Sequence, residues 1–217
     1  MRHYNHKDGK KSRITKLKSN DIIISSGLHA LFLPSIRECY DLKIFLDMDE
    51  NLRRFFKTQR DVLKRGHSLQ NVNKVFLQRK EDSLKYILWQ KKHADLVFSI
   101  KPINKIKYTD YNKNIDCPLG ITIYSPDGFD EHKLIRSLIG ILGAKVDTSS
   151  IPNSSGIELR IEADPTERDI EIFANKVCFN ILNLLDIKPK WKSGVTGIMQ
   201  LITLLKIEYV INKRLMF

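Results

Sequence analysis

Short apolar runs alternate with amphipathic stretches through the first half of the chain. The runs that begin at Ile22 and at Leu42 are brief, bounded by turn residues and rich in aliphatic side chains, a pattern that favours buried strands. A third such run, residues 94–100, comes after a polar helical stretch at 69–80. Because strands and helices alternate, we expect a mainly parallel α/β sheet in this half.

The clearest amphipathic segment spans residues 51–65. At about 100° per residue, its apolar side chains fall on one side of a helix. This side comprises Leu52, Phe55, Phe56, Gln59, Val62 and Leu63. The opposite side carries the cations Arg53, Lys57, Arg60 and Lys64. We expect Asp49 to mark the start of the helix and Gly66 to end it in a left-handed conformation.

The second half of the chain has a pattern of its own. Residues 101–118 are polar, Asn-rich and bounded by prolines, which indicates a domain boundary or a long connection. Strands are expected beyond it at 119–125 and 156–164, and helices at 130–143, 165–187 and 195–214, with Asp164 as a candidate cap. We therefore expect one domain over residues 1–101 and a small α+β domain over residues 117–217.

The composition shows a large excess of positively charged residues. The 217 residues are 42% apolar and 29% charged, as in a globular protein that can bury a core. There are 37 Lys and Arg against 25 Asp and Glu, a formal net charge of +12. This balance concentrates anionic partners such as nucleotides, sugar phosphates, nucleic acid or acidic membranes, without choosing among them.

Cysteine usage and apolar runs bear on the cellular compartment. The three cysteines are widely spaced, with no CxxC or Cys/His cluster typical of zinc sites, so we expect reduced thiols: Cys39, Cys117 and Cys178. The N-terminus lacks an apolar signal core. The longest apolar run, residues 198–211, is interrupted by Lys206 and Glu208 and is short for a bilayer span. We expect a cytoplasmic protein with no membrane partner.

Four short motifs occur in a fixed order along the first half. They are YNHKDG (Tyr4–Gly9), IIISSGLHALF (Ile22–Phe32), KTQRDVLKRGHS (Lys57–Ser68) and QKKHADLVF (Gln90–Phe98). Together they resemble the C-terminal part of the phosphoribulokinase/uridine kinase family, over roughly residues 4–100, and residues 191–205 are similar to the end of some bacterial relatives. The resemblance implies an α/β fold: part of a P-loop kinase-like parallel sheet with helices, and after it the small α+β unit.

The resemblance implies phosphoryl transfer from ATP to a sugar, sugar phosphate or nucleoside hydroxyl, in which the protein positions groups and neutralises phosphate charge. Lys57, Arg60 and Arg65 then occupy the places of lid cations near phosphates, and Arg53 matches a further basic position of the uridine kinase branch. Arginine suits this role because its forked donors match phosphate oxygens. The alternative reading of these cations is a solvated helix face.

The same resemblance implies three residues on the substrate side of the site. His29 matches a position near the active-site cleft, although a buried structural histidine is the alternative reading. Tyr4 and His6 match the sugar-phosphate side. Separately, Asp61 and Arg65 are spaced i, i+4, so we expect Asp61 to hold this arginine in place.

The sequence departs from the family in two respects. It contains no G-x-x-x-x-G-K-[ST] phosphate loop, which in the family precedes the YNH motif together with the catalytic aspartate. Ser26 stands where both branches carry a glutamate near the metal. We therefore expect a truncated or split kinase that is inactive alone. ATP and Mg²⁺ are implied as cofactors, and a P-loop-bearing chain or a homo-oligomer as partner.

Two alternative functions stay open at this point. A degenerate kinase fold could bind an anionic ligand or a partner without catalysis. Nucleic-acid binding is motivated by the net charge of +12. It is disfavoured because the cations lie on a helix opposite a full apolar face, and because few aromatic residues are interleaved with them.

Overall fold

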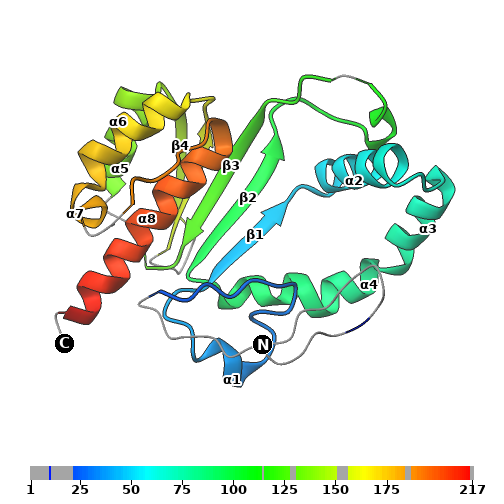
Figure 1. Ribbon diagram of the computed structural model, residues 1–217, viewed down its shortest axis with the longest axis horizontal. Helices are drawn as coiled ribbons and strands as arrows, with labels where there is room; N and C mark the ends of the chain where they lie inside the picture. The colour runs from blue at the N-terminus through cyan, green and yellow to red at the C-terminus, as the bar shows by residue number, and fades with distance from the viewer. Residues whose placement is uncertain are drawn as a thin grey trace.

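A single five-stranded sheet forms the centre of the computed structural model (Figure 1). The structure describes residues 10, 22–113, 115–127, 131–150, 156–183 and 187–215. In chain order the strands are β1 (Ile44–Met48), β2 (Leu96–Pro102), β3 (Leu119–Ser125), β4 (Lys145–Ser150) and β5 (Ile157–Glu162), arranged β1-β2-β3-β5-β4. The expected α/β class is confirmed. Parallel pairing is limited to β1 and β2, and the other adjacent pairs are antiparallel.

Helices lie around this sheet in two groups. The first half contributes α1 (Pro34–Arg37), α2 (Glu50–Thr58), the π-helical turn η1 (Gln59–Lys64), α3 (Leu69–Gln78), α4 (Lys80–Asp82), the π-helical turn η2 (Ser83–Ile87) and the 3₁₀ helix η3 (Leu88–His93). The second half contributes the short 3₁₀ turn η4 (Tyr108–Asp110), α5 (Glu131–Leu142), α6 (Glu167–Val177), α7 (Phe179–Leu182) and α8 (Gly194–Leu215).

Strand β2 joins the two halves. It pairs with β1 on one side and with β3 on the other, for example Val97 with Phe45 and with Tyr124. The expected boundary at residues 101–118 is a connection between two paired strands. The segments that the sequence suggested as separate units therefore share one sheet.

The strand expected at Ile22 is not formed. Residues 22–26 have no regular structure, and Ile22, Ile23 and Ile24 are exposed, Ile24 by 88%. Within the described part of the chain no strand pairs with this run. An apolar run becomes a buried strand only when a neighbouring strand and a covering layer exist, and the run itself encodes neither.

Helix α2 begins and ends as its sequence predicts, but its exposed face differs. Asp49 caps it, since one carboxylate oxygen accepts a hydrogen bond from the Leu52 N–H at 3.1 Å, and Gly66 has φ of 72°. The helix continues into the π-helical turn η1, which carries an extra residue per turn and rotates the side chains that come after it. Asp61 is consequently buried, at 7% exposure, while Leu63 of the expected apolar face is exposed. Phe56 is exposed as well.

The second half buries one face of the sheet under helices. Alternate residues of β3 and β5 enter the core beneath α5, α6 and α8, among them Ile121, Ile123 and Leu159. Two details differ from the sequence interpretation. Thr166 caps α6 in place of Asp164, through a capping box with Asp169. Strand β4 was not expected, because it is a polar strand at the edge of the sheet.

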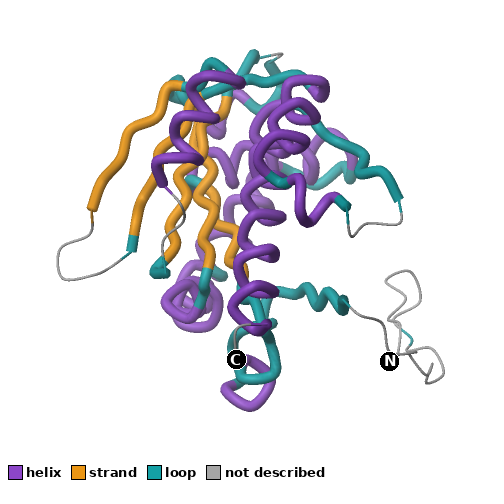
Figure 2. The backbone as a smooth tube through the Cα atoms, turned by 90° about the vertical axis from the view of Figure 1, so that its left-hand side faces the viewer, coloured by secondary structure: helices purple, strands orange, loops and turns teal. Residues whose placement is uncertain are grey.

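Helix α8 is apolar enough to resemble a membrane span over Gly194–Lys213 by length and composition alone. Part of this apolar surface packs in the core, where Ile198, Leu201 and Ile202 are buried against the sheet. Figure 2 shows α8 running beside the strands. The same helix carries Lys206, which is 1% exposed and donates a hydrogen bond from Nζ to the Ser125 Oγ at 2.8 Å.

The buried Lys206 predicts a pH dependence of stability. Burial lowers the pKa of Lys206 from its ordinary value of 10.5, so the folded protein holds this proton less tightly than the unfolded chain does. The free energy of unfolding should therefore rise with pH between the lowered pKa and 10.5. Urea denaturation over this range should show a smaller rise in Lys206→Met. The exposed Lys176→Met is the control, and an equal rise in both variants would contradict the prediction.

Candidate phosphate-binding site

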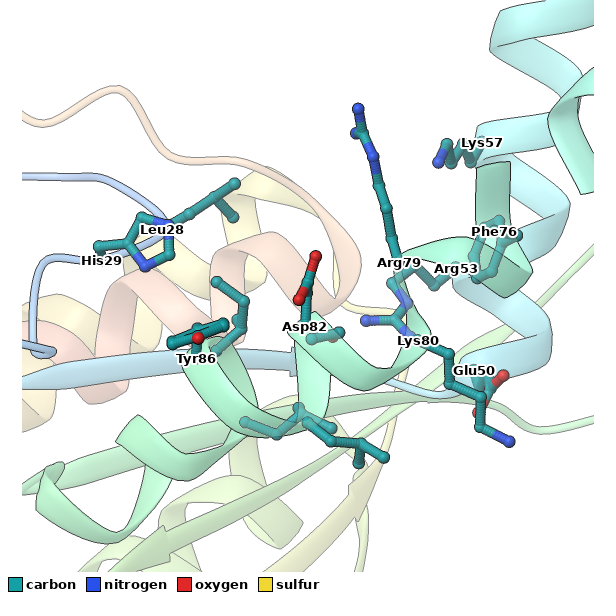
Figure 3. Close-up of a pocket in the computed structure, with 14 residues that line it drawn as sticks. Leu28, His29, Glu50, Arg53, Lys57, Phe76, Arg79, Lys80, Asp82 and Tyr86 are labelled. Carbon is teal, nitrogen blue, oxygen red and sulfur yellow. The ribbon is translucent and has the colours of Figure 1, made fainter. Parts of the chain in front are cut away.

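A cavity of about 470 Å³ lies between α2, α3, the α4–η2 segment and the loop that precedes α1 (Figure 3). Its apolar lining includes Leu28, Phe76, Leu84, Tyr86, Ile87 and Leu88. Its cations are Arg53, Lys57, Arg79 and Lys80. The carboxylates of Glu50 and Asp82 also border it. The cavity thus combines an apolar wall with a cluster of positive charge.

Helix α2 and Phe76 position two of the cavity cations. Arg53 and Lys57 are four residues apart and therefore lie one turn apart on the same side of α2. The Lys57 Nζ lies 4.7 Å and the Arg53 Cζ 5.7 Å from the centre of the Phe76 ring, in cation–π contact. Figure 3 shows Arg79 extending into the cavity between this pair and His29.

The cavity cations lack carboxylate partners. Within the described part of the chain, Arg53, Lys57, Arg79 and Lys80 make no salt bridge. The Arg53 Nε is buried and has no hydrogen-bond partner among the described residues. Because Arg53 lines the cavity beside the other cations, its guanidinium and its neighbours suit an anion that brings acceptor oxygens.

The pKa of Lys57 reflects its burial and the positive charges around it. Burial lowers the pKa of this amine from 10.5, and the positive charge of Arg79 lowers it further, with smaller contributions from Arg60 and Arg53. Asp61 opposes this shift but does not cancel it. A phosphate placed among these cations would stabilise the charged amine.

Arg60 and Arg65 occupy a different place. The Arg60 Nε lies 2.9 Å and the Arg65 Nη1 3.1 Å from the same Oδ1 of Asp61, and neither arginine lines the cavity. The hydrogen bond from Arg60 lowers the pKa of Asp61, and the charges of Arg60 and Arg65 add to this effect. The expected contact between Asp61 and Arg65 is confirmed. The phosphate contacts proposed for Arg60 and Arg65 stay predictions.

His29 lies at the cavity with its side chain exposed, so it is not a buried structural histidine. Its loop is fixed by Gln90, which is buried. The Gln90 Oε1 accepts a hydrogen bond from the Leu31 N–H at 2.8 Å, and its Nε2 donates to the carbonyl oxygens of Leu28 and Tyr86. Gln90 was not singled out from the sequence, although it is the first residue of the QKKHADLVF motif.

Three further residues named from the sequence lie away from this cluster or outside the described chain. Tyr4 and His6 lie outside the described residues. Ser26 is exposed in the loop before α1. The described residues include no group of three or more His, Cys, Asp or Glu that could hold a metal ion.

Comparison with known proteins identifies the family of the first half of the chain. Residues 1–107 match the model of the Phosphoribulokinase / Uridine kinase family. These residues belong to the phosphoribulokinase/uridine kinase family. The chain is 36% identical over 99 residues to a chloroplastic phosphoribulokinase of Chlamydomonas reinhardtii, which covers 46% of this chain and 26% of that protein. It is 39% identical over 61 residues to a uridine kinase of Ligilactobacillus salivarius, covering 28% of this chain and 29% of that protein.

A solved structure supports the fold over a longer stretch. The phosphoribulokinase from Rhodobacter spheroides superposes with a TM-score of 0.55 at 20% identity, covering 84% of this chain and 65% of that chain. The similarity therefore reaches beyond residue 107 into the second half. The chain spans only about a quarter to two fifths of the length of the phosphoribulokinases that it matches in sequence.

Gln90 can be tested as the residue that positions the His29 loop. Gln90→Met would leave the buried Leu31 N–H and two carbonyl oxygens without partners, at a cost of about 1–3 kcal/mol in the free energy of unfolding. Amide exchange at Leu31 should accelerate, as seen by NMR. Gln78→Met, at an exposed position on α3, is the matched control. Equal exchange in the two variants would contradict this role.

Asp61 can be tested through its effect on acid stability. The hydrogen bond from Arg60 lowers the pKa of Asp61 from 3.8. The ionised carboxylate therefore adds to the free energy of unfolding above pH 3.8, and this addition is lost as the pH falls through the folded-state pKa. Asp61→Asn should lower the free energy of unfolding at neutral pH by about 1–3 kcal/mol and flatten its acid dependence. The exposed Asp116→Asn should leave both unchanged, as measured by urea denaturation.

Proposed function

We propose that this chain is the phosphate-clamping part of an ATP-dependent kinase that phosphorylates a hydroxyl of a sugar, sugar phosphate or nucleoside. The observation that carries the proposal is the cluster of Arg53, Lys57 and Arg79 around a cavity, without carboxylate partners among the described residues. Phosphoryl transfer depends on such positioned cations, because the protein mainly orients the phosphates and neutralises their charge.

The proposal assigns the direct phosphate contacts to the cavity cations. Arg60 and Arg65 share the charge of one buried carboxylate, Asp61, and both have half-exposed side chains. Screening by water limits the interaction of such exposed groups to about 0–1 kcal/mol. Arg53 and Lys57, in contrast, are partly buried and unneutralised, so a hydrogen bond to phosphate there should contribute about 1.5–3 kcal/mol.

The residues present fit the phosphates of ATP better than they fit its metal. The cations that line the cavity suit phosphate oxygens. Glu50 and Asp82 border the cavity, and Mg²⁺ bound to a nucleotide commonly uses one or two carboxylates. We propose that residues 1–217 supply one part of the site, that a glycine-rich phosphate loop, which these residues do not contain, supplies the other, and that residues 1–217 alone transfer no phosphate.

Isothermal titration with ATP and with inorganic tripolyphosphate, each without metal, tests the clamp. Arg53→Met and Lys57→Met should each weaken binding of both anions about tenfold, which corresponds to the loss of roughly 1.4 kcal/mol. Lys64→Met, an exposed lysine on the same helical segment, is the matched control and should change the dissociation constant by less than about threefold. Equal weakening in all three variants would indicate a non-specific charge effect and overturn the assignment.

A further inference from the structure

A second cavity, of about 310 Å³, lies in the second half of the chain, between α5, the end of α6, α7 and α8. Figure 1 shows these four helices grouped on one side of the molecule, away from α2, α3 and α4. No residue that lines this cavity also lines the phosphate-binding cavity. Its volume lies at the lower end of the range for ligand pockets, which favours a small molecule.

Part of the lining of this cavity is apolar. Leu134 of α5 and Val177 at the end of α6 are buried residues of the core, and Leu205 of α8 packs against the same core. Leu205 and Glu208 are three residues apart on α8 and therefore lie on the same side of that helix. An apolar wall of this kind suits an aliphatic group of a ligand, because contact removes both surfaces from water.

Two opposite charges line the cavity from different helices. Lys133 lies on α5 and Glu208 lies on α8. Both act on the thiol of Cys178: burial raises the pKa of Cys178 to about 12, Glu208 adds to the rise and Lys133 opposes it. Lys133 and Glu208 nevertheless form no salt bridge with each other in the described structure. The cavity therefore holds an ammonium and a carboxylate that are near one another but not paired.

The carboxylate of Glu208 lacks a cationic partner. Glu208 is partly buried and makes no salt bridge within the residues that the structure describes. Two lysines of the same helix contact Tyr209 instead, since the Nζ atoms of Lys206 and Lys213 lie 4.7 Å and 5.9 Å from the centre of its ring. A partly buried carboxylate is stabilised by a charged donor, so Glu208 suits an ammonium group of a ligand.

The two charges together favour a zwitterion over a ligand with a single charge. A ligand with only an ammonium group would be attracted by Glu208 and repelled by Lys133, and a ligand with only a carboxylate would meet the reverse. A free amino acid carries both groups next to each other on one carbon atom. The exposed carboxamides of Asn180 and Asn212 also line the cavity, and each can donate and accept hydrogen bonds.

We propose that the cavity between α5, α6, α7 and α8 binds a free α-amino acid with an aliphatic side chain. Glu208 accepts hydrogen bonds from the ammonium group of the ligand, and Lys133 donates to its carboxylate. The aliphatic side chain lies against Leu134, Val177 and Leu205. A lysine ammonium has three donors, so Lys133 can bind the ligand while it keeps another contact. This site is independent of the phosphate-binding function proposed above.

Titration with L-leucine, followed by NMR of the full chain, tests the site. L-Leucine should shift the amide signals of Leu134 and Glu208 with a dissociation constant below about 1 mM. Three probes should each bind at least about tenfold more weakly: N-acetyl-L-leucine lacks the ammonium group, L-leucinamide lacks the carboxylate, and glycine lacks the side chain. The absence of any shift with L-leucine, or equal affinity for any of the three probes, would overturn the proposal.

Substitutions assign the two charged groups of the ligand. Glu208→Gln should weaken binding of L-leucine at least about tenfold but leave that of N-acetyl-L-leucine unchanged, because this probe has no ammonium group to lose. Lys133→Met should do the same for L-leucine and spare L-leucinamide. The exposed Glu167→Gln and Lys192→Met are matched controls and should change the dissociation constant by less than about threefold. Wild-type affinity in both site variants, or equal losses in the controls, would contradict the assignment.

The phosphate-binding variants keep the two proposals distinguishable. Lys57→Met should bind L-leucine as the wild type does, because Lys57 lines only the other cavity. Loss of L-leucine binding in Lys57→Met would place the amino acid elsewhere and overturn the proposed site.

Discussion

Strand β2 is buried on both faces, and its packing and pairing set the positions of the elements around it. Leu96, Val97 and Phe98 are almost completely buried, with Leu96 and Phe98 in the core beneath the helices and Val97 in a second cluster with Leu31 and Ala94. Two covered faces explain why this run is continuously apolar. The strand also pairs with β1 and β3 at once, so it fixes the position of α2, and with it the cavity cations, relative to the second half.

The carboxylate of Asp61 pairs with two cations of the first half and leaves the cavity cations without a carboxylate partner among the described residues. Asp61 is buried because the π-helical turn η1 rotates it inward, and it neutralises Arg60 and Arg65 from one oxygen. Lys57 and Arg53, one and two turns earlier, face the cavity instead. The same basic helix therefore carries a structural ion pair at its end and an unneutralised pair at its centre. Sequence spacing alone places these cations around one basic side of a helix. It cannot show which of them pair with Asp61 and which line the cavity.

The sequence predicted the elements with strong local signals. Asp49, Gly66 and the periodicity between them define α2, and the apolar runs at β1, β2 and β3 define strands. The features that it missed depend on tertiary contact. The run at Ile22 has no strand to pair with among the described residues, and the polar β4 is a strand only because β5 lies beside it. A π-helical turn is not encoded by a residue pattern, so Asp61 could be predicted as a partner of Arg65 but not as a buried one.

In the candidate site too, local sequence signals predicted single residues, whereas the grouping of these residues depends on tertiary contacts. Lys57, Arg53 and His29 were predicted and do line the cavity. Gln90 ties the His29 loop to Tyr86 of η2, and Phe76 of α3 contacts Arg53 and Lys57. Arg79 lies between helices α3 and α4, where no periodicity marks it. Cations of this kind bind a phosphate tightly only when a second set of donors closes around it, since surface charge alone is screened.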